Sequence, residues 1–294
     1  MSAAPIVLLE IALLLTTGLV VARGALRTTI AIVLACGCLA LPIWLPAQPS
    51  WLRFVLALAS QLSVLRTIEV LRDARPHGAA MRMFAFVAPL DALAVTAARP
   101  RLDVRGVAYA IATSMLGGIG VAMVWLAPLG TWHWPVASLG CAIGMLGTMD
   151  ALACTNRALL RAVGIESPAV QDEPWRARTV AEFWSRRWNR AVGAWLRRFC
   201  FAPLARRGHV VMGMLAAFVV SAWIHFWPVL VAVGLAPALA MGGFFVAQAM
   251  CIVVEAKLGV ARWRRPAQHA WTIAVMLGAS PLFCVPMLLV LGYR

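Results

Sequence analysis

One histidine of this chain lies deep inside an apolar stretch. Residues 219–228 read Val-Val-Ser-Ala-Trp-Ile-His-Phe-Trp-Pro, and His225 is the only one of the five histidines well inside such a run. A polar side chain in hydrocarbon is costly, so its presence there needs a reason. Neutral imidazole can accept a proton from a hydroxyl near neutral pH, which makes His225 a candidate general base. The alternative is a histidine that bonds to a neighbouring helix and has no catalytic role.

A second set of candidate residues lies in the sequence Phe-Trp-Ser-Arg-Arg-Trp-Asn at residues 183–189. Arg186 and Arg187 belong to a cluster of arginines that could bind the phosphates of a nucleotide-bearing ligand through charge-assisted hydrogen bonds. The same arginines could instead bind anionic lipid head groups. Asn189 falls on the border between an apolar and a basic helix face, where a solvated residue without a chemical role is also compatible with the pattern.

Two carboxylates and most of the seven cysteines also lie in apolar surroundings. Asp91 and Asp150 are expected to be buried partners of arginines, because intramembrane carboxylates usually find partners. The alternative is a direct catalytic role for one of them. The cysteines show no zinc or redox spacing, and we interpret them as small hydrophobic residues. We therefore expect no metal site.

The elements that position these residues must be membrane helices. Of the 294 residues, 63% are hydrophobic and 13% are charged, and the mean hydropathy is +0.85. A soluble globule of this size could not hide so much apolar surface. The net charge of +15 comes from basic residues in short stretches between apolar runs, as the positive-inside rule produces, so nucleic acid is not an expected partner. We predict a single all-α, polytopic membrane domain over residues 1–294.

Eight apolar runs can account for about eight transmembrane helices: 5–22, 28–45, 51–70, 106–127, 135–160, 210–235, 238–254 and 270–291. The first run precedes its basic residues and is expected to be a signal anchor. The run 51–70 carries Arg53, Gln61, Arg66 and Glu69, so it must face protein or an aqueous cavity for part of its length.

The basic loops predict the orientation of these runs. Residues 83–97 are too short to span and contain Pro89 and Asp91, so we expect a re-entrant or interfacial segment. With that segment not spanning, the basic loops alternate correctly. Both ends of the chain then lie outside, and the arginine-rich stretch 164–208 is cytoplasmic.

Within that stretch, residues 179–200 are predicted to form one amphipathic helix. The segment begins with Thr-Val-Ala-Glu, which has the form of a capping box. Apolar side chains then recur at spacings of three or four and share one face: Val180, Trp184, Trp188, Val192, Trp195 and Phe199. The opposite face carries Arg186, Arg190 and Arg197. A cationic helix with tryptophans on its apolar face is typical of the membrane interface.

Residues 183–189 resemble the tryptophan motif of the membrane-bound O-acyltransferase (MBOAT) superfamily, and most of all its wax synthase-like branch. In that branch a Gly-Ile segment and a proline precede the motif, and a later helix carries a histidine. Here Gly164 and Ile165 precede Pro168, and His225 follows Asn189 by about 36 residues. The later segments 243–245 and 280–283, together with Glu255, extend the resemblance over residues 164–286. Two positions depart from the pattern, Ser185 in place of glycine and Phe226 in place of glutamate, and they leave the acceptor open.

The resemblance implies a membrane enzyme that transfers a fatty acyl group from acyl-CoA to the hydroxyl of a lipophilic alcohol, with acyl-CoA as a co-substrate and no permanently bound cofactor. It implies that His225 acts as the general base and that Asn189 stabilises or positions the acyl donor. Acyl-CoA would be held by Trp184, Trp188, Arg186 and Arg187.

Other functions stay open at this point. The acceptor could be another hydroxyl, such as that of a sterol, a polyketide or a glycan. A transporter or a lipid-binding protein is a different class, and the absence of visible inverted repeats argues against the transporter. Arginine supplies all but one of the 26 basic residues, which together with the many alanines suggests a GC-rich genome and hence a bacterial inner membrane.

Overall fold

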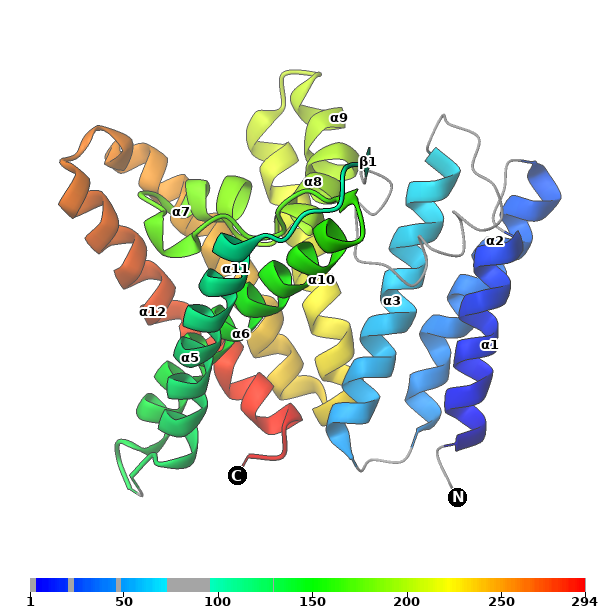
Figure 1. The fold of residues 1–294 in the computed structure, drawn as a ribbon, viewed down its shortest axis with the longest axis horizontal. Coiled ribbons are helices and arrows are strands. Elements are labelled where there is room, and N and C mark those ends of the chain that lie inside the picture. The colour runs from blue at the N-terminus through cyan, green and yellow to red at the C-terminus, as the bar shows by residue number, and fades with distance from the viewer. Residues whose placement is uncertain (1–3, 21–23, 46–48, 73–95, 129, 294) are drawn as a thin grey trace. The chain divides into compact units, whose positions relative to one another are not determined.

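The computed structural model describes residues 4–20, 24–45, 49–72, 96–128 and 130–293. Seven helices in these ranges are long and apolar enough to cross a membrane, and a shorter apolar helix precedes them. The shorter helix is α1 (Ala4–Val20), and the seven long helices are α2 (Ala25–Ala40), α3 (Ser50–Arg72), α5 (Val104–Trp125), α6 (His133–Ala162), α10 (Val210–Val233), α11 (Leu235–Leu258) and α12 (Arg265–Val290) (Figure 1). Each predicted apolar run coincides with one of them. The prediction of an all-α polytopic membrane protein is confirmed.

The chain divides into two compact units. The first comprises Met1–Leu93, Trp223–Leu239 and Leu289–Arg294, and the second comprises Ala94–Ala222 and Ala240–Leu288. Helices α10, α11 and α12 contribute residues to both units, so the chain passes from one unit to the other within each of these helices. That residues 1–294 act as a single domain stays a prediction.

In the first unit, α1, α2 and α3 pack together, and α3 turns its polar side chains inward. Arg66 and Glu69 form an ion pair of 2.6 Å, with 2% and 6% of their side chains exposed. Gln61 donates from Nε2 to the backbone carbonyl oxygen of Trp223 in α10, at 3.2 Å. The prediction that residues 51–70 face protein is therefore confirmed. A buried pair is the arrangement that a membrane segment needs, because unpaired charges in hydrocarbon are costly.

In the second unit, α5 and α6 form a tight hairpin. A Cβ atom built on Gly120 would lie 2.1 Å from the Gly144 nitrogen, and one built on Gly147 would lie 2.4 Å from the Gly117 nitrogen. Two backbones can approach this closely only where both helices present small residues. The glycines therefore fix the register of the hairpin.

The chain segments that flank this hairpin meet at one end of it. The strand β1 (Thr96–Ala97) pairs antiparallel with β2 (Ile165–Glu166). The start of α5 and the end of α6 thus lie on the same side, as the basic loops predicted. The re-entrant segment predicted for residues 83–97 lies outside the described residues except for Thr96 and Ala97.

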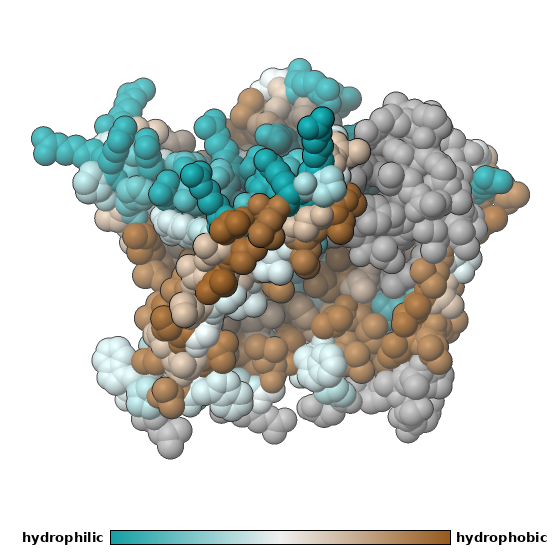
Figure 2. Space-filling model, viewed as in Figure 1, coloured by the Kyte–Doolittle hydropathy of each residue, from teal (hydrophilic) through white to brown (hydrophobic). Residues whose placement is uncertain are grey.

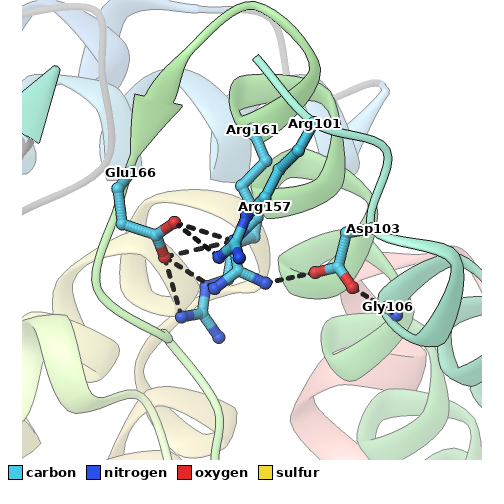
Figure 3. Close-up of polar contacts among 6 residues, drawn as sticks. All are labelled: Arg101, Asp103, Gly106, Arg157, Arg161 and Glu166. Carbon is cyan, nitrogen blue, oxygen red and sulfur yellow. Dashed lines mark hydrogen bonds and ion pairs between the residues drawn. The ribbon is translucent and has the colours of Figure 1, made fainter. Parts of the chain in front are cut away.

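Three arginines surround one carboxylate at this end of the hairpin (Figure 3). Glu166 accepts hydrogen bonds from Arg101, Arg157 and Arg161, at distances between 2.6 and 3.3 Å. The bonds from Arg161 and Arg157, foremost that of Arg161, lower the pKa of Glu166 to about 2. Glu166 is therefore ionised at neutral pH and anchors the segment that follows α6.

Asp103 connects the same cluster to the start of α5. Its Oδ1 accepts the Gly106 backbone N–H at 3.0 Å, which makes it the N-cap of α5, and its other oxygen contacts Arg161. The Gly106 N–H and the Arg161 guanidinium together hold the pKa of Asp103 below its usual range. The cap satisfies a backbone donor that the first turn of a helix would otherwise leave unpaired.

Asp150 is buried, with 1% of its surface exposed, but its partner differs from the expected arginine. Its Oδ2 accepts the hydroxyl of Tyr109 at 2.7 Å, and the Tyr109 ring stacks on Trp175 at 5.6 Å. The prediction was wrong because the packing of α5 against α6 places a tyrosine opposite Asp150. Asp91 lies outside the described residues.

Figure 2 shows hydrophilic side chains gathered at the end of the second unit that carries β1 and the segment after it, with apolar surface along α5. Exposed apolar side chains on α5 include Ile111, Met115 and Ile119. Exposed hydrophobic residues along a helix shaft fit contact with lipid. This distribution agrees with the sequence-based assignment of the arginine-rich stretch to an aqueous side.

We predict that Gly120→Ala destabilises the α5–α6 hairpin by about 1–3 kcal/mol, because the added methyl group would overlap the Gly144 nitrogen and the Gly140 carbonyl oxygen. Gly118→Ala is the matched control, since a Cβ there meets nothing within 4 Å. Thermal unfolding of the detergent-purified proteins should show a lower Tm for the first variant alone. Equal Tm values would contradict the close approach of the two backbones.

Candidate functional site

The tryptophan motif lies in a broken helical segment, and the prediction of one continuous helix over residues 179–200 is wrong. The segment consists of α7 (Val180–Glu182), a π-helical turn η4 (Phe183–Arg187), α8 (Arg190–Leu196), a second π-helical turn η5 (Arg197–Phe201) and α9 (Ala202–Ala205). Trp188 is extended, with ψ of 131°, and Asn189 is left-handed, with φ of 39°. The chain therefore changes direction between η4, which carries Trp184, and α8, which carries Trp195.

Hydrogen bonds to residues 170–172 stabilise this break. The Asp172 N–H donates to the carbonyl of Arg187 at 3.0 Å, and the Arg190 N–H donates to the carbonyl of Val170 at 2.8 Å. The Asn189 N–H donates to Oε1 of Gln171 at 2.9 Å. Backbone groups that an unbroken helix would pair internally are thus paired with a neighbouring segment, which satisfies them equally well.

Asn189 has a structural task at this break. Its Oδ1 accepts the Val192 N–H at 3.4 Å and so caps the N-terminus of α8. Asparagine is among the few residues that adopt the left-handed conformation at low cost. The structure therefore explains an asparagine at position 189 by backbone geometry, and a role in acyl transfer would come in addition to it.

The two predicted faces persist in spite of the break. Trp195 is buried, Trp184 and Trp188 are half-buried, and the arginines expected on the opposite face are exposed, namely Arg186, Arg190 and Arg197. The extra residue in each π-helical turn shifts the helical phase, yet both turns keep the aromatic side chains inward. That this segment lies in a membrane interface stays a prediction.

The start of the motif is fixed by a carboxylate from another helix. Glu255 of α11 is 5% exposed and accepts the N–H groups of Val180 and Ala181 at 2.6 and 3.2 Å. Its Oε2 also accepts the indole N–H of Trp271 in α12, at 3.1 Å. A negative charge at a helix N-terminus is stabilised by the free N–H groups and by the helix dipole. Glu255 thereby joins α7, α11 and α12.

The predicted capping box forms in a modified way. Thr179 Oγ1 accepts the Glu182 N–H at 2.9 Å, as expected, but the Glu182 carboxylate accepts the N–H of Arg178. The other carboxylate oxygen accepts Nε of Arg187 at 2.7 Å. Burial favours the neutral form of Glu182, but the bonds from Arg178 and Arg187 outweigh it and lower the pKa of Glu182.

The two neighbouring arginines of the motif have different environments. Arg187 bonds to Glu182 and also donates to the carbonyl oxygens of Asp172 and Glu173, at 3.1 and 3.4 Å. Arg186 is exposed, and the structure gives it no ion pair among the described residues. Arg187 therefore stabilises the fold of the motif, and Arg186 is available to a ligand.

Trp184 is enclosed by aromatic rings from two membrane helices. Phe218 of α10 and Phe244 and Phe245 of α11 lie with their ring centroids 5.7–6.1 Å from that of Trp184. The indole N–H donates to Oε1 of Gln248 at 3.1 Å. Trp188 stacks on Phe183 at 5.7 Å, and Phe183 contacts Trp184 edge to face at 5.1 Å.

His225 is half-buried in α10 and follows Val210 by 15 residues, which corresponds to roughly 22 Å along a helix axis. Trp223, two residues earlier, stacks on Phe226 and contacts Trp227. His225 belongs to the first unit and Asn189 to the second. That the two residues share one site stays a prediction.

Sequence reasoning missed one buried polar residue of α11. Gln248 is fully buried. The available signal was its position: a glutamine amide within an apolar run has to be paired in the same way as a histidine. Glu255 was noted only as part of a family resemblance, and its task became visible through its three donors.

The class of protein is now defined: a polytopic α-helical membrane protein whose tryptophan motif is anchored against two membrane helices. The sequence model of the family described as "Membrane bound O-acyl transferase family" matches residues 167–247. This range begins just after β2 and contains the motif, His225 and the aromatic residues of α11.

Curated relatives extend this match. A protein of Simmondsia chinensis named "Long-chain-alcohol O-fatty-acyltransferase" is 28% identical over 169 residues, which cover 53% of this chain and 48% of the relative. An Arabidopsis thaliana protein named "Probable long-chain-alcohol O-fatty-acyltransferase 2" is 31% identical over 139 residues, which cover 43% and 40%. The matched segments thus span half of these relatives or less. Residues 167–247 are thus similar to the membrane-bound O-acyltransferase family, and the matched plant relatives carry the name of long-chain-alcohol O-fatty-acyltransferases.

We predict that Glu255→Gln destabilises the protein by at least about 2 kcal/mol, because an amide cannot accept from three donors as the carboxylate does. The matched control is Glu173→Gln, which removes a surface ion pair with Arg176 and should change stability by less than about 1 kcal/mol. The Tm of each detergent-purified variant measures the difference. A Glu255→Gln protein as stable as the control would show that these bonds do not hold the motif.

Proposed function

We propose that the chain is a membrane-bound O-acyltransferase that moves a fatty acyl group from acyl-CoA to the hydroxyl of a lipophilic alcohol and so forms a wax-type ester. The observation that carries the proposal is the family match over residues 167–247, which includes both the tryptophan motif and His225. The names of the plant relatives support a long-chain alcohol as the acceptor and a fatty acyl group as the cargo. We place the protein in the inner membrane of a bacterium on the composition of its basic residues.

His225 is the general base in this mechanism. The alcohol oxygen attacks the carbonyl carbon of the thioester while the imidazole takes the hydroxyl proton. The carbon–sulfur bond then breaks, and the departing thiolate of coenzyme A takes the proton back from the imidazolium. An ester and free coenzyme A leave, and His225 is neutral again.

The motif residues serve the acyl donor. Arg186 is exposed, and its guanidinium can form charge-assisted bonds to phosphate. Arg187 holds the motif through Glu182, and Trp184 and Trp188 give its buried face a rigid apolar shape. Asn189 fixes the turn that follows Trp188 and positions the donor through that turn.

Replacement of His225 by Ala should lower ester formation by at least about 10²-fold, the low end for loss of a general base. The measurement is lipid mass spectrometry of cells that express each protein and receive fatty alcohol. His209→Ala is the control, because His209 is an exposed histidine at the start of α10. A folded His225→Ala protein with near wild-type ester formation would contradict the mechanism, and the family match would then describe the fold alone.

Replacement of Arg186 by Ala should raise KM for acyl-CoA several-fold more than KM for the alcohol. The reason is that the contacts of Arg186 with the donor phosphates would be equally strong in the bound substrate and in the transition state. Arg207→Ala is the matched control, since Arg207 is also an exposed arginine of the same stretch. Arg187→Ala should lower the Tm as well, because Glu182 loses its partner. Equal changes in both KM values for Arg186→Ala would favour a lipid head group as the ligand.

A further inference from the structure

The amide of Gln248 is half satisfied. Gln248 lies in the middle of α11 and is fully buried, with 0% of its surface exposed. Its Oε1 accepts the indole N–H of Trp184, and its Nε2 has no hydrogen-bond partner among the described residues. A buried donor without a partner costs free energy and calls for an explanation, such as a ligand group that is bound only during function.

The orientation of this amide is fixed by chemistry. An indole nitrogen can only donate, so the group of Gln248 that faces Trp184 must be its carbonyl oxygen. The NH2 group must then point away from the indole. A flipped amide would place two donors against each other and would leave the carbonyl oxygen buried without a donor.

The surroundings of the amide are aromatic. Phe244 and Phe245 precede Gln248 by four and three residues on α11 and therefore share its helix face. Both rings contact Trp184, and Phe283 of α12 contacts both of them, at 5.3 and 6.3 Å between centroids. Among these described neighbours, the indole N–H of Trp184 can only donate and the phenylalanine rings carry no oxygen or nitrogen, so none of them accepts a proton from Nε2.

A donor-only group in an apolar setting selects its ligand. A hydroxyl bound there would still need an acceptor for its own proton, whereas a carbonyl oxygen needs only a donor. The groups next to that carbonyl must also be apolar, because aromatic rings surround the amide. An acyl carbonyl with its hydrocarbon chain meets both conditions.

We infer that the NH2 group of Gln248 binds the acyl carbonyl oxygen of the fatty acyl donor, with Trp184 holding the amide in the required orientation. This inference rests on the proposed function and adds a binding residue to it. Gln248 recognises the acyl group, whereas Arg186 recognises the phosphates, so the two contacts act on different parts of one donor.

The test uses two acyl-CoA analogues of equal chain length that the enzyme cannot cleave. One is a ketone in which a methylene separates the sulfur from the carbonyl, and the other is an alkyl thioether without a carbonyl. Binding of each to the detergent-purified full-length protein gives two Kd values. The wild type should bind the ketone about 2- to 12-fold more tightly than the thioether, which is the range for one neutral hydrogen bond.

Gln248→Met removes the NH2 group and keeps the length of the side chain. This variant should bind both analogues with the same Kd, and its Kd for the thioether should equal that of the wild type. Gln268→Met is the matched control: Gln268 is a buried glutamine whose Nε2 is satisfied by the carbonyls of Val260 and Ala261. It should keep the preference for the ketone.

The outcomes separate this inference from the proposed function. Equal Kd values for the two analogues in the wild type would overturn the inference alone, even if Gln248→Met did not fold. A preference for the ketone that survives Gln248→Met would also overturn it. Failure of the wild type to bind either analogue would overturn the proposed function and the inference together.

Discussion

The second unit depends on one buried carboxylate. Glu255 accepts two backbone N–H groups from the start of α7 and the indole N–H of Trp271, so a single side chain of α11 holds the motif segment and α12 in place. The N–H groups at a helix start have no partner within the helix, and the dipole of the helix favours an anion there. Thr179 satisfies a further donor of the same turn. This anchor fixes the start of the motif segment, and the positions of the later motif residues depend on it.

Downstream of that anchor, the chain uses two π-helical turns and one left-handed residue to keep its aromatic side chains buried. Trp184 is directed against α10 and α11, and Trp195 is buried six residues beyond Asn189. The same turns leave Arg186 exposed and direct Arg187 to Glu182. Two adjacent arginines thus divide into one that stabilises the fold and one that a ligand can reach.

Polar groups inside the membrane helices fall into two kinds. Arg66 with Glu69 and Tyr109 with Asp150 are paired, and such pairs stabilise helix packing where water is absent. The NH2 group of Gln248 is of the other kind, because its neighbour Trp184 can satisfy only the oxygen of the amide. An unsatisfied buried donor of this kind calls for an explanation, and the inferred acyl contact provides one.

The sequence alone determined the membrane helices, because a run of about 20 apolar residues has no stable alternative to a helix in lipid. The spacing also indicated correctly which side chains of residues 179–200 are buried or half-buried and which arginines are exposed, although the segment is not one continuous helix. Likewise, the motif at 183–189 together with His225 indicated the family whose sequence model matches residues 167–247.

Only the tertiary structure decided where the amphipathic segment breaks and which partners the buried groups have. The break at Trp188 and Asn189 depends on hydrogen bonds to residues 170–172, and helical periodicity carries no information about a neighbouring segment. The pairing of Asp150 with Tyr109 depends on the register of α5 against α6, which close glycine contacts set. The anchor at Glu255 joins residues 75 positions apart. Such contacts follow from how packed helices place their surfaces together, and spacing along one helix cannot specify them.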